Sequence, residues 1–202
     1  KGKHTAKAEE AIRVQMVALE KQHAIDLNKL DLQVVKQRVE MENKKYAYLI
    51  DATAKGTREM YDLQVAKMAN DKALAEAEMT ASITDEQQRH DLMLALEASY
   101  QAKADALRAT YLKQVREEQQ KAITEQFAGD VTNATQQGDE LGALQIKLDQ
   151  KKAMMDAANM AEYESEQAKN AAILQASNEY YAAQEELSNK RREVEVANTE
   201  AI

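Results

Sequence analysis

The chain has 202 residues, with no proline, cysteine or tryptophan and five glycines, and these absences remove most helix breakers and any disulfide framework. Aromatic residues make up 4% of the chain, too few for an ordinary globular core or a β-sandwich. The net charge is −8 with both signs interleaved, which argues against binding to nucleic acid or an anionic membrane, and no apolar run approaches the roughly 18 residues that cross a bilayer.

The first predicted element is a long helix in residues 1–83. At 1.5 Å per residue such a helix is about 125 Å long and needs neighbours along its length. Two apolar series, offset by about 200° around the helix, predict contacts on opposite sides. One series comprises Leu27, Leu30, Val34, Met41 and Tyr48, interrupted by Gln37 and Lys44. The other comprises Leu32, Val35, Val39, Tyr46 and Leu49.

A break is predicted near Ser82 to Thr84. Thr84 is followed three residues later by Gln87, which is the spacing of a capping box, and Ser82 with Asp85 offers a second register. A helix that continues through this point is the alternative.

A second helix is predicted in residues 84–128, followed by a glycine-containing connection in residues 129–139. The helix places Leu92, Leu96 and Leu107 at helical spacing. In the connection, Gly129 is positioned like a C-terminal cap, and Asp139 is suited to cap the next helix. A connection of this length is expected to reverse the chain.

A third helix is predicted in residues 140–202. Its seven-residue series has alanine and polar residues beside it, so we expect close but weak packing. The series runs through Ile146, Ala153, Met160, Gln167, Leu174 and Tyr181. The fold class is therefore all-α, with long helices in an elongated coiled-coil-like or three-helix antiparallel bundle arrangement, forming one elongated helical unit.

We predict no catalytic, cofactor-binding or metal-binding residues, and hence no enzyme. A bundle di-iron site needs two Glu-x-x-His pairs, and the chain has one, Glu20 with His23. His90 and the acidic pair Glu117 and Glu118 are interpreted as solvated helix surface. The Asn133-Ala134-Thr135 sequon is discounted because no secretory signal accompanies it. Three methionines are a candidate partner surface near the start of the third helix: Met154, Met155 and Met160.

Two stretches carry a family resemblance. Ala18–Leu27 and Ala143–Asp156 resemble the helical central regions of bacteriophage and prophage tail tape measure proteins. The resemblance is one of composition and style over most of the chain, without a diagnostic motif. It implies a chain inside a tail tube whose helical length sets tail length, present in several copies and without an active site. The implied location is the virion tail, or the bacterial cytoplasm during assembly.

Two other function classes remain open. The first is a coiled-coil scaffold or adaptor, either soluble and intracellular or secreted, which would bind protein partners through helix packing and would form a homo-oligomer in one of its forms. The second is a curvature-sensing or pore-forming helical protein, which would need a basic face or an apolar hairpin that the sequence does not show. The basic start Lys1-Gly2-Lys3-His4 and the absence of an initiating methionine are interpreted as signs of a fragment or processed piece.

Overall fold

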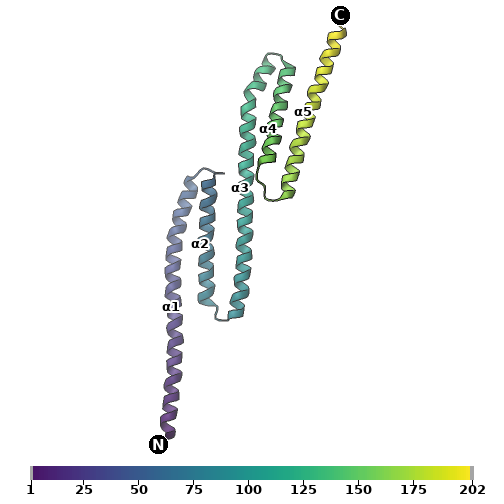
Figure 1. Ribbon diagram of the computed structural model, residues 1–202. Coiled ribbons are helices and arrows are strands. Elements are labelled where there is room, and N and C mark those ends of the chain that lie inside the picture. The colour runs from purple at the N-terminus through teal and green to yellow at the C-terminus, as the bar shows by residue number, and fades with distance from the viewer. Residues whose placement is uncertain (1, 201–202) are drawn as a thin grey trace. The chain divides into compact units, whose positions relative to one another are not determined.

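The computed structural model describes residues 2–200, with side chains described for residues 7–199. In this part of the chain the fold is all-α, as predicted: every regular element is a helix. The helices are α1 (Gly2–Ala52), α2 (Arg58–Ser82), α3 (Glu86–Gln136), α4 (Glu140–Met160) and α5 (Glu166–Glu200) (Figure 1). Long and short helices alternate, and α1 and α3 have the same length of 51 residues.

The helices belong to two compact units. One contains α1, α2 and the beginning of α3 as far as Ala104, and the other contains the rest of α3 from Asp105 onward, with α4 and α5. The sequence predicted one helical unit with three long helices. Two turns that the prediction missed account for the larger number of helices.

The first missed turn interrupts the helix predicted over residues 1–83. Between α1 and α2, Gly56 has φ of 79°, a left-handed conformation that favours glycine. Thr57 then caps α2, because its hydroxyl accepts a hydrogen bond of 3.2 Å from the backbone N–H of Met60. One glycine followed by one capping threonine is therefore enough to end one helix and start the next.

The break predicted near Ser82 to Thr84 is confirmed, with a different capping residue. Residues 83–85 are not helical, and the Asp85 carboxylate accepts a hydrogen bond of 2.6 Å from the backbone N–H of Gln88. Thr84 is thus not the N-cap that the capping-box spacing suggested. An aspartate at the N-cap also places negative charge at the positive end of the helix dipole, which favours this register.

The predicted end of the second helix at residue 128 is wrong. Helix α3 continues through Gly129 to Gln136, and the turn is made by Gly138, whose φ is 72°. A glycine inside a helix costs only about 1 kcal/mol, which the rest of a long helix offsets. The expected cap at Asp139 is confirmed, because its carboxylate accepts a 2.8 Å hydrogen bond from the Gly142 N–H.

The second missed turn interrupts the helix predicted over residues 140–202. Helix α4 ends at Met160, and residues 161–165 connect it to α5 without a glycine. Ser165 caps α5 by accepting a 3.1 Å hydrogen bond from the Ala168 N–H. The connection is held by side chains of the second unit, as described below, so helical periodicity gave no sign of it.

Antiparallel pairing organises each unit. Lys36 with Glu78, and Asn43 with Asp71, join α1 to α2, so that residue numbers rise along one helix as they fall along the other. Buried apolar residues are few and small: of the seven found among the described residues, four are alanine. They are Val39, Leu112, Ala134, Ala143, Ala157, Ala158 and Leu187. Such a core provides little hydrophobic stabilisation, at about 25 cal/mol per Å² of apolar area buried.

Candidate helix-packing interface

The inner stripe of α1, formed by Leu32, Val35, Val39, Tyr46 and Leu49, is the side that packs toward α2. Val39 is 1% exposed and the other members are half-buried or nearly so. Leu32 and Val35 share a hollow with Ala77 and Ala81 of α2. This confirms the predicted contact of one of the two apolar series with a neighbouring helix.

Polar side chains fix the register of this pairing. Asn43 donates a 2.6 Å hydrogen bond to the carboxylate of Asp71, and Asn70 donates one of 2.8 Å to Glu42. The two bonds run in opposite directions between the helices, at adjacent positions. Because a shift of either helix would break both, this polar layer selects one alignment of α1 with α2.

Helix α3 continues the packing of the first unit. Lys72 of α2 forms an ion pair with Glu97, and this hydrogen bond raises the pKa of the lysine. Burial, followed by the negative charge of Asp71, raises the pKa of the Tyr100 hydroxyl. Lys103 lies 4.4 Å from the centre of the Tyr100 ring. These contacts leave α2 between charged partners on α1 and α3.

The outer stripe of α1 is the opposite side of the helix, and the first unit leaves it exposed. We define it by eight large apolar side chains spaced along one side of the helix, whose exposed fractions range from 47% to 76%. They are Ile12, Met16, Leu19, Leu27, Leu30, Val34, Met41 and Tyr48. The predicted series from Leu27 to Tyr48 is therefore part of a longer stripe that starts at Ile12, is interrupted by a few polar residues and has no partner helix within its own unit.

The beginning of α1 extends past the end of α2. The hollow between the two helices brings Asn28 and Asp31 beside Thr80 and Ala81, close to the last helical residue Ser82. All side chains from residue 7 to residue 31 are exposed. More than two further turns of apolar side chains on α1 are thus presented to solvent, well beyond the scattered single residues that a surface normally carries.

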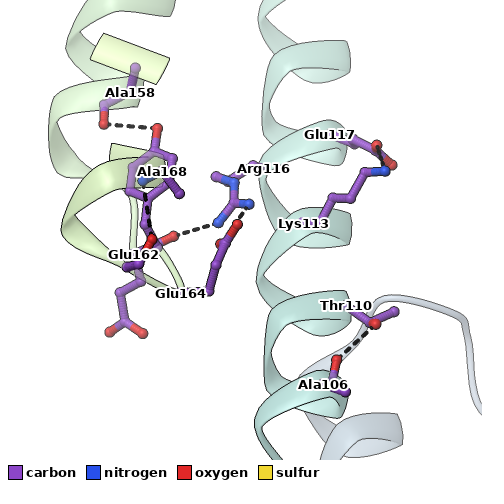
Figure 2. Close-up of polar contacts among 11 residues, drawn as sticks. Ala106, Thr110, Lys113, Arg116, Glu117, Ala158, Glu162, Glu164 and Ala168 are labelled. Carbon is purple, nitrogen blue, oxygen red and sulfur yellow. Dashed lines mark hydrogen bonds and ion pairs between the residues drawn. The ribbon is translucent and has the colours of Figure 1, made fainter. Parts of the chain in front are cut away.

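A polar cluster in the second unit surrounds Arg116 of α3 (Figure 2). Its guanidinium donates hydrogen bonds of 2.9 Å to the carbonyl of Glu162 and 3.0 Å to the carboxylate of Glu164. It also lies 4.5 Å from the centre of the Tyr163 ring. The Tyr163 hydroxyl donates a 3.1 Å hydrogen bond to the carbonyl of Ala158. All these groups satisfy one another, so the cluster holds the turn between α4 and α5 and offers no reactive group.

The surroundings of Glu164 in this cluster favour the charged form of its carboxylate. A hydrogen bond to its own backbone, followed by those to Arg116, lowers the pKa of Glu164, while partial burial opposes the shift. The Arg116 side chain is 18% exposed, against 39% for Glu164. The pair is therefore partly shielded from solvent, unlike the i to i+4 pair of Lys113 with Glu117 drawn beside it at 3.8 Å.

The seam between α4 and α5 is alanine-rich, as predicted, but the single seven-residue series is wrong. Ile146 and Ala153 are half-buried, whereas Leu174 and Tyr181 are each 63% exposed. The turn at residues 161–165 ends the register of α4, so α5 presents other residues to it, including the buried Leu187. Periodicity counted across a turn does not describe a shared face.

Ion pairs border this seam. Lys151 contacts Glu179 at 2.7 Å and Lys190 contacts Glu140 at 2.7 Å. The hydrogen bond from each lysine is the largest cause that lowers the pKa of its glutamate, and Glu140 in turn raises the pKa of Lys190. The latter pair lies at a hollow of about 410 Å³ beside Gly138 and Ala143. The charged groups of Lys190 and Glu140 at this hollow are paired with each other.

The methionines predicted as a partner surface are divided by the structure. Met154 and Met155 are half-buried on α4, and Met160 at its end is 79% exposed. Only Met160 is therefore presented as expected for a contact residue. The sequon residues Asn133 and Thr135 lie in the last turn of α3, where the Thr135 hydroxyl donates 2.8 Å to the carbonyl of Val131.

The histidines and acidic residues considered for chemistry are not assembled into a site. His23 and His90 are exposed on α1 and α3. Among the described residues, no group of three or more His, Cys, Asp or Glu side chains is placed to hold a metal ion. The outer stripe of α1 is consequently the most prominent candidate functional surface.

Within residues 2–200, none of the helices combines the length and the apolar character needed to cross a membrane. No protein-family model, no curated protein and no solved structure matches this chain.

Proposed function

We propose that this chain is a structural helical protein that acts by packing its helices against protein partners, without catalysis. The observation that carries the proposal is the outer stripe of α1, where eight large apolar side chains are 47% to 76% exposed. Apolar surface of this extent on the solvent-exposed side of a helix is typical of a binding surface. The small cores of the two units, of which the second is alanine-rich, point the same way, because they leave much of the apolar side-chain area for partners.

The first form of this function is a tail tape measure-like segment that sets length or scaffolds assembly inside a phage tail. It is supported by the all-α composition and the long helices. In a phage whose tails contain this chain, removing or duplicating whole helices should change tail length, by up to about 1.5 Å for each helical residue. Tail length measured by electron microscopy would test it, and unchanged tails would exclude the ruler.

The second form is a coiled-coil scaffold or adaptor that joins protein partners. The antiparallel pairing of α1 with α2, and of α4 with α5, favours it, because a chain that reverses within each unit uses its helices to build surfaces. If the ruler is excluded, this form predicts that removing whole helices abolishes the binding of protein partners, while the length of the assembly stays the same.

The shared function is tested by substitution on the outer stripe. The double variant Leu19→Glu/Leu30→Glu should fail to join the native assembly, because it buries two carboxylates in an apolar contact. The matched control Val17→Glu/Ile25→Glu alters exposed apolar residues on another side of α1 and should still join. Equal incorporation of both variants, measured by co-purification from the native source, would refute the proposed surface.

A further inference from the structure

We propose that the outer stripe of α1 binds the outer stripe of a second copy, with the two helices antiparallel about a two-fold axis at Leu30. The proposal rests on the proposed function and deepens it by naming the partner. It follows from the area of the stripe, from how its residues match under reversal, and from the charges along its edge.

The area is sufficient for a stable pair. Each of the eight side chains exposes on the order of 100 Å², so the stripe offers about 800 Å² per copy, which is the usual contribution of one partner to a specific interface. The stripe extends from Ile12 to Tyr48, about 54 Å at 1.5 Å per residue. Helix α2 lies against the inner stripe, on the opposite side of α1, so it leaves room for a second helix.

Reversal about Leu30 places five of the eight stripe residues opposite one another. It places Ile12 opposite Tyr48 and Leu19 opposite Met41, while Leu30 meets its own copy. The polar residues His23 and Lys44, which interrupt the stripe, also lie opposite residues that can pack against them. His23 lies opposite Gln37, and Lys44 lies opposite Met16, along which its aliphatic stem can pack while its amine reaches solvent.

A parallel pair in register would match the same residues less well. It would place Lys44 against Lys44 and His23 against His23, with like charges facing each other at the lysines. The antiparallel arrangement avoids this repulsion, and it places Leu27 opposite Gln33 and Val34 opposite Asp26, each one residue from the partner's stripe.

Charge along one edge of the stripe supports the same orientation. Glu20 and Arg38 are 18 residues apart, or five helical turns, and so project from the same edge. In the two-fold pair this edge meets its own reversed copy, which brings Glu20 of each chain within two residues, about 3 Å along the helix axis, of Arg38 of the other and places Asp31 near its own copy. Arg38 contacts Glu42 of its own helix at 3.8 Å and is 67% exposed, so it is available for this pairing. Such pairs contribute little free energy but select orientation.

The pairing also supports the part of α1 that α2 does not reach. Residues 7–31 are all exposed, and a helix is held mainly by packing of its apolar side rather than by propensity. In the antiparallel pair, this part lies along the second half of the partner's α1, which is braced by the partner's α2.

Self-association of the purified chain is the first test. Sedimentation equilibrium should show a dimer, and Leu19→Glu/Leu30→Glu should weaken it by at least about a hundredfold, because Leu30 lies on the two-fold axis and Leu19 faces Met41 of the partner. The control Val17→Glu/Ile25→Glu should dimerise normally. Circular dichroism on both variants shows whether the α1 and α2 hairpin has kept its helix. A chain that stays monomeric at about 100 µM, far above the dissociation constant of a specific interface of this size, overturns the proposal.

Cysteine crosslinking tests the orientation, and the absence of native cysteine makes every new thiol unique. Under mild oxidation, Leu30→Cys should crosslink to itself. Ile12→Cys should crosslink only when mixed with Tyr48→Cys, because reversal brings these positions together. Self-crosslinking of Ile12→Cys alone would show a parallel pair and overturn the proposal.

The two tests separate this inference from the proposed function. If the purified chain is monomeric but the stripe variant is still excluded from the native assembly, the stripe binds a different protein. The second copy is then refuted and the structural function stands. If Leu19→Glu/Leu30→Glu changes neither dimerisation nor incorporation into the native assembly, both the pairing with a second copy and the proposed function of the stripe are refuted.

Discussion

Arg116 of α3 and Glu164 of the turn between α4 and α5 are joined by a 3.0 Å ion pair, although 48 residues separate them in the chain. The same guanidinium donates to the Glu162 carbonyl and lies over the Tyr163 ring. One side chain thus holds three consecutive residues of a turn that contains no glycine.

The Arg116→Ala variant should therefore destabilise the second unit by about 1 kcal/mol, since it removes charge-assisted hydrogen bonds and a cation–π contact from a partly exposed site. Arg116→Lys should recover only a part, because an amine lacks the planar fork that serves two acceptors. Thermal unfolding followed by circular dichroism measures both. Lys113→Ala is the control, because its pair with Glu117 at 3.8 Å is well exposed and should contribute almost nothing. An equal loss in both alanine variants would contradict this account of the turn.

The two glycines near the end of α3 should respond in opposite ways to alanine. Gly129 is inside the helix, and an added Cβ meets nothing within 4 Å, so Gly129→Ala should stabilise by about 0.5 to 1 kcal/mol. Gly138 has φ of 72°, so Gly138→Ala should destabilise by about 1 kcal/mol. Urea unfolding of the two variants compares them directly. If Gly129 were the helix cap, as its sequence context suggested, the signs would be reversed.

The hydrogen bond between Asn43 and Asp71 should show coupling in a double-mutant cycle. Each alanine substitution removes one side of a partly buried 2.6 Å contact between α1 and α2. We expect an interaction free energy of about 1 kcal/mol, measured by urea unfolding of both single variants and the double variant. Gln22→Ala provides a control, because the Gln22 to Asp26 bond is exposed on a part of α1 that extends past α2. Additive effects at Asn43 and Asp71 would show that this bond does not set the register.

Stability of the second unit should fall at low pH. The folded unit lowers the pKa of Glu140 and Glu179 through Lys190 and Lys151. The stability that these two ion pairs contribute is therefore fully present above the ordinary carboxyl pKa of about 4.3. It is lost as the pH falls through the lower pKa of each glutamate in the folded state. The effect should be small and weakened by salt, because these side chains are well exposed.

Unfolding midpoints measured between about pH 6 and pH 3 in low and high salt test this dependence. The Glu140→Gln/Glu179→Gln double variant should show a shallower fall than the parent chain. An identical pH profile would place the acid sensitivity in other carboxylates.

The all-α fold and the two-sided character of α1 could be predicted from sequence because both depend on local properties. Absence of proline and an excess of helix-forming residues fix the backbone conformation over most of the chain. Spacing by three and four residues then assigns Val39 to one side and Met41 to another, whatever the neighbours are. The cap at Asp139 and the break after Ser82 could also be predicted from local sequence, because each capping hydrogen bond spans only three residues.

The positions of the other turns, and the choice of which α1 stripe is buried, were decided by tertiary structure. Gly129 and Gly138 carry a similar local signal, yet of the two Gly138 adopts the left-handed conformation, at the turn between α3 and α4. The turn before Ser165 depends on Arg116, 46 residues away from Glu162. The inner stripe is buried because Asn43 and Asn70 find carboxylates on the facing helix, and the outer stripe of Leu19, Leu30 and Met41 stays exposed because its own unit supplies no helix to cover it. Helical periodicity describes one helix at a time, whereas burial is a property of two helices brought together.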